Sequence, residues 1–347
     1  MKRIILLSFL IVLTAVSLFA QADLQPVATV NLTRSEPITV RQLRTEVERY
    51  ETAAGQPLTV AQRREVLDAM INQRLIIQAA ARDRVAITEN EVNQYVQDLR
   101  TQMAQSIGRQ PTDAEFNQEI RNQTGMDMAA FREMIQREGI IQRYIVTKKE
   151  AIISSVQIPT EAEIIEQYNL VRTQLVRPET VRFTMIMVPF GADASSRTAA
   201  RQTADRLHRE IGSNAANFDE TVARSAAPNS GYQAGDVGYV PRNQEARNLI
   251  GQSLLNAAFS VRQGQVSSVI EGSQGFCIIK VTENHAQKNL ELDDLFQLGT
   301  RITVRDYIRQ SMLSERQQEV FQRATEELLT ELRRGNPFTI FENRLNW

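Results

Sequence analysis

Few residues in this chain are of the types that carry out acid–base, nucleophilic or metal chemistry. The sequence contains one cysteine, Cys277, and two histidines, His208 and His285. A single cysteine cannot form an intramolecular disulfide, and so few thiol and imidazole ligands argue against a zinc site. Cys277 lies in an apolar run, which is typical of a small buried residue, whereas both histidines have polar neighbours and are expected at the surface. We therefore expect no metal and no cofactor.

One acidic residue, Asp236, stands in a distinctive setting. It belongs to the run Gly235-Asp-Val-Gly238, in which two glycines bracket the carboxylate. Glycine adopts backbone angles that other residues avoid, so the segment predicts a tight loop leading into a short strand. Asp236 could act as a general acid or base, but bracing this loop is the simpler role.

Composition limits the classes of protein to consider. The 347 residues are enough for two domains, each with its own core. Lys and Arg number 40 against 41 Asp and Glu, which gives a formal net charge of −1. A general nucleic-acid-binding protein would carry a marked positive excess, so we expect no nucleic-acid partner.

The N-terminus has the pattern of a secretory signal peptide, residues 1–20. Lys2 and Arg3 precede an apolar run, and small residues follow at Ala20 and Ala22, after either of which cleavage is expected. The alternative is an uncleaved N-terminal anchor. No cysteine lies near the cleavage point, so a lipoprotein is excluded, and no later segment is apolar enough to cross a membrane. These features predict a periplasmic protein that is not transmembrane after cleavage.

A helical domain is predicted for residues 21–176. Its main signal is the capping box, a Thr followed three residues later by Glu or Gln at the start of a helix. Apolar residues follow each box at helical spacing. The boxes are Thr39–Gln42, Thr59–Gln62, Thr88–Glu91, Thr112–Glu115 and Thr160–Glu163.

Four methionines lie in these predicted helices, where we expect them to line a groove. They are Met103, Met126, Met128 and Met134. Packing in a core is the alternative. Flexible, polarisable methionine side chains also suit the binding of varied apolar segments.

A compact α+β unit is predicted for residues 177–285. Pro178 interrupts the helical pattern before it, because the residue preceding proline is driven out of the helical region. The predicted order is strand, helix, helix, glycine loop with short strand, helix, strand, strand. The corresponding residues are 181–188, 195–211, 218–225, 234–239, 247–259, 266–270 and 276–281.

The C-terminal segment, residues 286–347, predicts one long helix and one strand. The helix would begin at Asp293 or Thr303 and end at Gly335-Asn-Pro337. We expect residues 338–341 to pair with residues 27–32. The fold class is therefore α+β: both ends of the chain form one helical domain, and the smaller α+β domain is inserted into it.

Six segments of the inserted unit together form a recognisable pattern: 181–188, Phe218–Ser225, Gly235–Tyr239, Ala257–Phe259, Gly264–Ser267 and Gly275–Val281. In these segments the unit resembles a parvulin-type peptidyl-prolyl isomerase domain. The whole chain is similar to the SurA and PrsA class of exported chaperones, in which a helical domain made from both ends of the chain carries a parvulin insert.

The residues at the family's catalytic positions differ from those of active members. Active parvulins have a His in the first strand, an Asp or Cys before the Gly-Asp-x-Gly element and a second His in the last strand. This chain has Met185, either Ala227 or Pro228, and Cys277 at these places. The resemblance therefore implies a degenerate site with weak or lost isomerase activity.

The resemblance also assigns roles that do not depend on catalysis. The apolar floor that cradles a proline ring corresponds to Ile250, Leu254 and Phe259. Gly235, Asp236 and Gly238 correspond to the structural loop of the family.

Three functions remain open from the sequence. The resemblance implies a chaperone or foldase that binds unfolded outer-membrane or secreted proteins without a cofactor. The second is an active prolyl isomerase with a non-standard site, and the third is an assembly partner with one dedicated client. A homodimer is among the assemblies open to the chain.

Overall fold

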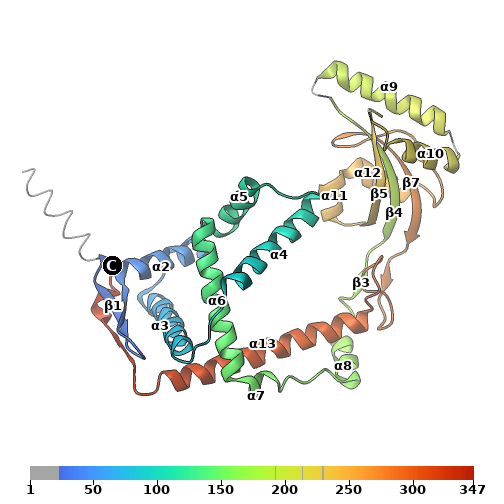
Figure 1. The fold of residues 1–347 in the computed structure, drawn as a ribbon. Coiled ribbons are helices and arrows are strands. Elements are labelled where there is room, and N and C mark those ends of the chain that lie inside the picture. Colours follow the sequence, from blue (N-terminus) through green and yellow to red (C-terminus); the bar gives the residue numbers. More distant parts are fainter. Residues whose placement is uncertain (1–22, 192, 213, 229) are drawn as a thin grey trace, which may run out of the picture. The chain divides into compact units, whose positions relative to one another are not determined.

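The computed structural model describes residues 23–191, 193–212, 214–228 and 230–347 (Figure 1). The expected signal peptide lies outside these residues. The chain divides into two compact units, one of residues up to 157 together with 315–347, the other of residues 158–314. Helix α13, Val304–Leu332, contributes its first turns to the second unit and the rest to the first. Residues 158–176 and 286–314 thus group with the inserted unit.

The first unit is mainly helical. Its helices α2 to α5 begin where the sequence predicts, because their four capping boxes make both of their hydrogen bonds, and α6 begins after Asp127, which accepts from the backbone N–H of Ala130. The helices are α2 (Val40–Ala54), α3 (Val60–Arg82), α4 (Glu89–Ile107), α5 (Asp113–Thr124), α6 (Met128–Lys148) and the short α7 (Glu150–Ile153).

A small antiparallel sheet joins the two ends of the chain in this unit. Strand β1 (Pro26–Val30) lies between β2 (Glu36–Thr39) and β9 (Phe338–Ile340), and a short 3-10 helix, Glu342–Arg344, follows β9. The predicted pairing of the C-terminal strand with the N-terminal one is therefore confirmed. Strand β2 was not predicted.

The core of the first unit draws on both segments of the chain. Leu67, Ile71 and Tyr144 from the N-terminal helices pack with Leu328 and Leu345 from the C-terminal segment. All five side chains are 3 % exposed or less. Burial of this apolar surface requires the final 33 residues, 315–347, to be in place.

The second unit is built on a four-stranded antiparallel sheet in the order β5-β4-β7-β6. Alternate residues of β4 and β7 face opposite sides of this sheet. Helices α9 and α10 cover the face that holds Ile186 and Ile278, and α11 and α12 cover the face that holds Phe183 and Ile279. The elements are β4 (Thr180–Pro189), α9 (Ala194–Ile211), α10 (Ala215–Arg224), β5 (Gln233–Pro241), α11 (Gln244–Ile250), α12 (Gln252–Ser260), β6 (Ile270–Glu271) and β7 (Gly275–His285).

Three local predictions in this unit need correction. The segment 234–239, predicted as a loop leading into a short strand, lies wholly within the longer strand β5. This strand is bulged: Phe183 faces Gly238 and Thr184 faces Asp236, so Val237 is the extra residue. The predicted helix 247–259 is two helices, separated by Gly251 at φ 83° and ψ 154°. The predicted strand 266–270 is reduced to a single bridge and the first residue of β6.

The remaining part of the second unit forms a small module beside the sheet, which we call the neck module. It comprises α8 (Glu161–Val171), the strand pair β3 (Val176–Arg177) and β8 (Lys288–Asn289), residues 290–303 and the start of α13. Ile164, Leu290, Val304 and Ile308 form its core. The Thr303 hydroxyl accepts from the N–H of Asp306 at 3.1 Å, so the later of the two predicted helix starts is correct.

Candidate functional site

One face of the sheet brings together most of the residues that the sequence assigned to the parvulin site. Cys277 in β7 lies directly opposite Met187 in β4, and Met185 is two residues further along the same face. Leu254, Ile250 and Phe259 from the two covering helices pack into the same cluster. We call this side of the sheet, with the residues just named, the apolar face.

Two of the assigned residues do not join the apolar face. Ala227 and Pro228 lie in the exposed turn after α10 and are absent from its cluster. Neither side chain has an ionisable group, so this turn supplies no acid, base or thiol to the site. Met185, Ile250 and Phe259 are half-buried, whereas Leu254 is 4 % exposed.

The Cys277 thiol has the properties of a core residue. It is 2 % exposed, and burial raises its pKa to about 11. Its polar contact is the carbonyl oxygen of Gly275 at 3.9 Å. Gly275 itself fits only as glycine, since a Cβ there would lie 2.4 Å from the carbonyl oxygen of Val188. A protonated thiol enclosed by apolar groups is poorly suited to nucleophilic or redox chemistry.

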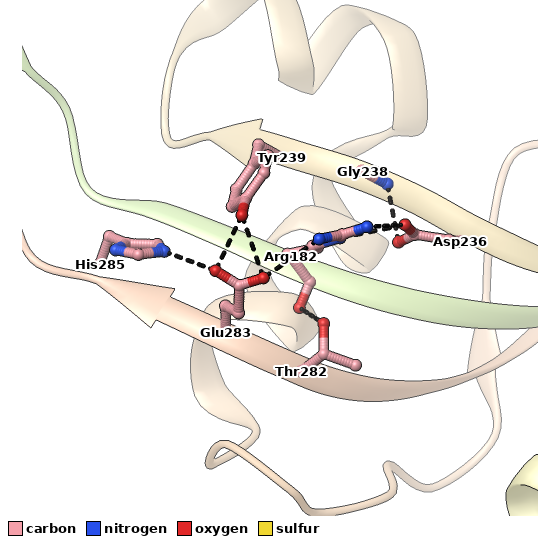
Figure 2. A network of polar contacts seen from close by, with 7 residues as sticks. All are labelled: Arg182, Asp236, Gly238, Tyr239, Thr282, Glu283 and His285. Carbon is pink, nitrogen blue, oxygen red and sulfur yellow. Dashed lines mark hydrogen bonds and ion pairs between the residues drawn. The ribbon is translucent and has the colours of Figure 1, made fainter. Parts of the chain in front are cut away.

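The other face of the sheet holds a network of charged side chains (Figure 2). Arg182 lies between Val181 and Phe183, which both face the apolar side, so its side chain points to the opposite side. Its guanidinium donates to Asp236 Oδ2 from Nε at 3.0 Å and from Nη2 at 2.5 Å. It also donates to Glu283 Oε1 at 3.2 Å, so one cation joins carboxylates from the two strands that flank β4.

Glu283 is the centre of this network. Its carboxylate accepts from Tyr239 Oη at 2.8 and 3.0 Å and lies 3.0 Å from His285 Nε2. Hydrogen bonds from His285, Tyr239 and Arg182 lower the pKa of Glu283. The Arg182 hydrogen bonds likewise lower the pKa of Asp236, whose Oδ1 accepts from the N–H of Gly238 at 3.1 Å. Both carboxylates are thus ionised near neutral pH and brace the bulged strand.

The two histidines are less exposed than the sequence suggested. His285 is the last residue of β7, and its side chain is 28 % exposed beside Glu283. His208 is half-buried in α9, and its Nδ1 is buried without a hydrogen-bond partner. The partner of His285 lies two residues away on the same strand, whereas the contact of its ring with Tyr239, at a centroid distance of 5.8 Å, comes from the more distant strand β5.

The helical unit contains a second candidate site, a hollow of about 590 Å³ that we call the α4–α5 groove. Phe116, Ile120 and Phe131 are buried beneath it, and Met103 packs against them. The lining residues are Tyr95, Leu99, Gln102, Met103, Ser106, Ile107, Phe116, Glu119, Ile120, Gln123, Thr124 and Phe131.

Another hollow of about 420 Å³ lies between α2, α3 and α6, where Met126 and Met134 line it. Three of the four methionines therefore line one or the other of two hollows, while all four also pack against the apolar cluster of Phe116, Ile120 and Phe131, so the groove and the core-packing alternatives both hold in part. Met128 packs against the cluster beneath the α4–α5 groove.

Two further findings concern the described residues alone. Among residues 23–347, apart from the three gaps, no group of three or more His, Cys, Asp or Glu side chains is placed to hold a metal ion. In the same part of the chain, every helix is too short or too polar to span a bilayer.

The fold and the apolar face define the class of protein. A helical unit is made from both ends of the chain, and an α+β domain is inserted into it. The sheet of this domain holds most of the residues that correspond to a parvulin site. Comparison with family models agrees. Residues 184–283 match the PPIC-type PPIASE domain, and residues 2–145 match the SurA-like N-terminal domain. The chain thus contains a parvulin-type domain and a SurA-like N-terminal domain, and in this combination it is similar to the SurA and PrsA class.

Curated relatives are distant and longer. The foldase protein PrsA of Clostridium acetobutylicum is 21 % identical over 263 residues, which cover 76 % of this chain and 69 % of the relative. The chaperone SurA of Alkalilimnicola ehrlichii is 24 % identical over 270 residues, which cover 77 % of this chain and 57 % of the relative. The chain spans about half the length of the SurA relatives, for example 47 % of that of Alcanivorax borkumensis.

Solved structures show the same distant similarity. A SurA-like chaperone of Campylobacter jejuni is 11 % identical with a TM-score of 0.40, covering 91 % of this chain and all of that one. PrsA of Bacillus subtilis is 15 % identical with a TM-score of 0.26, and the match covers 90 % of this chain and 93 % of that one.

Proposed function

We propose that the protein is a periplasmic chaperone that binds unfolded outer-membrane or secreted polypeptides, and that its parvulin-type domain has little or no isomerase activity. The observation that carries the proposal is the α4–α5 groove, an apolar hollow whose lining is only partly covered by the chain itself. The relatives' names, chaperone and foldase, support the same class of activity.

The groove is suited to client binding because its helices leave apolar surface unburied. In α4 only Val92 is buried, although Val96, Leu99 and Met103 all face the cluster below. Tyr95 is 50 % and Ile107 is 42 % exposed. Apolar surface of this kind on a soluble helical unit is typical of an interaction site, and flexible methionine adapts to varied partners.

Periplasmic location rests on the N-terminal pattern of residues 1–20. A positive start, an apolar run and small residues before the mature chain direct export. An exported chaperone meets its clients unfolded as they enter the compartment, which fits binding through many weak apolar contacts.

Weak isomerase activity follows from the chemistry of the apolar face. Rotation about a prolyl peptide bond has a barrier of roughly 20 kcal/mol, which a catalyst lowers by stabilising the twisted amide. Preorganised hydrogen bonds contribute a few kcal/mol to such stabilisation. Met185 and Cys277 provide no strong donor, and the thiol is 2 % exposed.

The test of chaperone activity is suppression of aggregation when a urea-unfolded outer-membrane β-barrel protein is diluted into buffer. Equimolar protein should reduce light scattering, and Met103→Gln, which puts an amide into the groove at similar volume, should weaken the effect. Leu249→Gln is the control, since Leu249 is 81 % exposed in the other unit. Equal scattering with and without the wild-type protein would refute the proposal.

The second candidate is an active isomerase, favoured by the half-buried floor residues Ile250 and Phe259. A protease-coupled assay with a proline peptide separates the two. We expect no rate above the uncatalysed reaction. A clear gain that disappears in Leu254→Ala or Phe259→Ala would favour the isomerase instead.

A further inference from the structure

We propose that the α4–α5 groove selects by charge: it takes uncharged apolar segments flanked by Lys or Arg and disfavours segments flanked by Asp or Glu. This inference rests on the proposed chaperone function and adds a client preference to it. The residue that carries the preference is Glu119.

Glu119 is the one charged residue that lines this groove. Its side chain is half-buried on α5, one helical turn from the buried Phe116 and next to the buried Ile120. The Oε1 atom of Glu119 accepts from Gln123 Nε2 at 2.6 Å. Within the described residues, no cation forms an ion pair with Glu119. A half-buried carboxylate without a counter-ion attracts a cation more strongly than a fully solvated one does.

The other carboxylates of these two helices are mostly neutralised. Arg100 pairs with Asp113, and Arg109 pairs with Glu115 at 2.5 Å. Glu89 and Glu91 at the start of α4 pair with Arg132 and Arg143 of α6. Arg100 also lies close to the groove, 5.3 Å from the centre of the Phe116 ring, but its charge is balanced by Asp113.

The remaining uncompensated charges leave the groove negative. Among the described residues, the polar contact of Asp98 on α4 is with the amide of Gln94. Arg121 on α5 is exposed, but residues two apart on a helix point to different faces, so it does not neutralise Glu119. A segment in the groove therefore meets the carboxylate of Glu119 directly, while Asp98 adds a second negative charge on α4, one of the two helices that line the groove.

The rest of the lining is suited to a segment without charge. Tyr95, Leu99 and Ile107 are apolar or amphipathic, and Gln102 and Ser106 supply uncharged hydrogen-bonding groups at the edge. These two side chains are one helical turn apart and have no partner within the described part of the protein. They can satisfy backbone groups of a bound segment that would otherwise lose their hydrogen bonds to water.

The experiment measures fluorescence anisotropy of three labelled peptides with one uncharged apolar centre and flanking Lys, Gln or Asp. The full-length mature protein at low salt should bind the Lys peptide about three- to fivefold more tightly than the Asp peptide, the size expected of a partly exposed ion pair. In Glu119→Gln the two affinities should converge, as they should for the wild type in 0.5 M NaCl.

Glu220→Gln is the matched control, because Glu220 is an exposed carboxylate on α10 in the other unit. It should keep the wild-type preference, and circular dichroism should show that both variants are folded. Equal binding of all three peptides by the wild type would overturn the charge preference and leave the chaperone function standing. A preference that survives Glu119→Gln would overturn the role of Glu119. Failure of every peptide to bind, together with no suppression of aggregation, would overturn the function itself.

Discussion

Arg182 shows how one side chain can hold three strands together. Its guanidinium bonds to Asp236 of β5 and Glu283 of β7 from its own place in β4. All three side chains are between 33 and 42 % exposed, so solvent screens the charges. The geometry is nevertheless favourable, because the Asp236 contact is made by two nitrogens of a planar group.

We predict that Arg182→Met lowers the free energy of unfolding of the parvulin-type unit at pH 7, and only by a small amount because solvent screens these exposed charges. The lowered pKa values of Asp236 and Glu283 set the pH dependence. Stabilisation from a carboxylate with a depressed pKa is present above its unfolded pKa and is lost as pH falls through the folded one. Urea unfolding of wild type and variant should therefore converge on acidification below about pH 4. A difference that persists unchanged at pH 3 would contradict this account.

A second prediction concerns the Cys277 thiol. Because its pKa is raised to about 11 and it is 2 % exposed, it should react with a disulfide reagent such as DTNB very slowly at pH 8. The same thiol should react fully and quickly in 6 M guanidinium chloride. Rapid labelling of the native protein would show that the apolar face opens to solvent.

The sequence predicts the contacts of a side chain when its partners are near in the chain. The bracing role of Asp236 depends on Gly238, two residues away, and could be anticipated. Its main partner Arg182 is 54 residues distant, and Glu283 is 101 residues from Arg182. Such partners follow only from strand register, which one sequence does not reveal.

Gly251 shows that one helical pattern of apolar residues can span two separate helices. Ile250, Leu254 and Ala258 recur at helical spacing across it, so the sequence predicts one helix. The glycine nevertheless adopts φ 83° and ψ 154°, which L-residues avoid, and thereby separates α11 from α12. Amphipathic spacing alone does not detect a break when both pieces bury the same face.

We predict that Gly251→Ala destabilises the parvulin-type unit by about 1–3 kcal/mol, the cost of holding a non-glycine residue in this region. Gly235→Ala is the matched control: a Cβ at Gly235 meets nothing within 4 Å, and its φ is outside the left-handed range. The control should change the unfolding midpoint little. Equal effects of the two substitutions would argue against backbone strain as the cause.

Capping chemistry explains why the helical unit was predicted better than the sheet. Each Thr and its Glu or Gln lie within four consecutive residues, so the helix start is encoded locally. The bulge in β5 is a property of pairing with β4, and strand β2 depends on pairing with β1. Pairing between distant strands is only weakly encoded in the local sequence.

The two units differ in how much of the chain each requires. Residues 158–314 contain three apolar clusters made entirely from their own side chains. The helical unit, in contrast, needs Ala324, Leu328 and Leu332 of α13 to complete its core. The insertion was predictable from the two terminal strands, whereas the grouping of α8 with the inserted unit depends on contacts with Leu290 and Val304.

We predict that a fragment of residues 158–314 folds alone and unfolds cooperatively on heating, as followed by circular dichroism. A fragment of residues 23–157 should lack a cooperative transition, because its core is incomplete and β1 lacks its partner strand β9. Adding residues 315–347 as a separate peptide should restore structure in part. A sharp transition in the 23–157 fragment by itself would disprove the requirement for the C-terminal segment.

The pairing of β1 with β9 also dictates an order of folding events as the chain is made from its N-terminus. Residues 28–30 must wait for residues 338–340, so their pairing closes a loop of about three hundred residues. The inserted unit is complete once residue 314 has emerged, while the helical unit with its apolar groove is not. The chain therefore passes through a stage in which the helices of the α4–α5 groove lack part of their core and expose apolar surface that favours aggregation. Until residues 315–347 have been made, the chain is itself partly unfolded, like the polypeptides that we propose it binds.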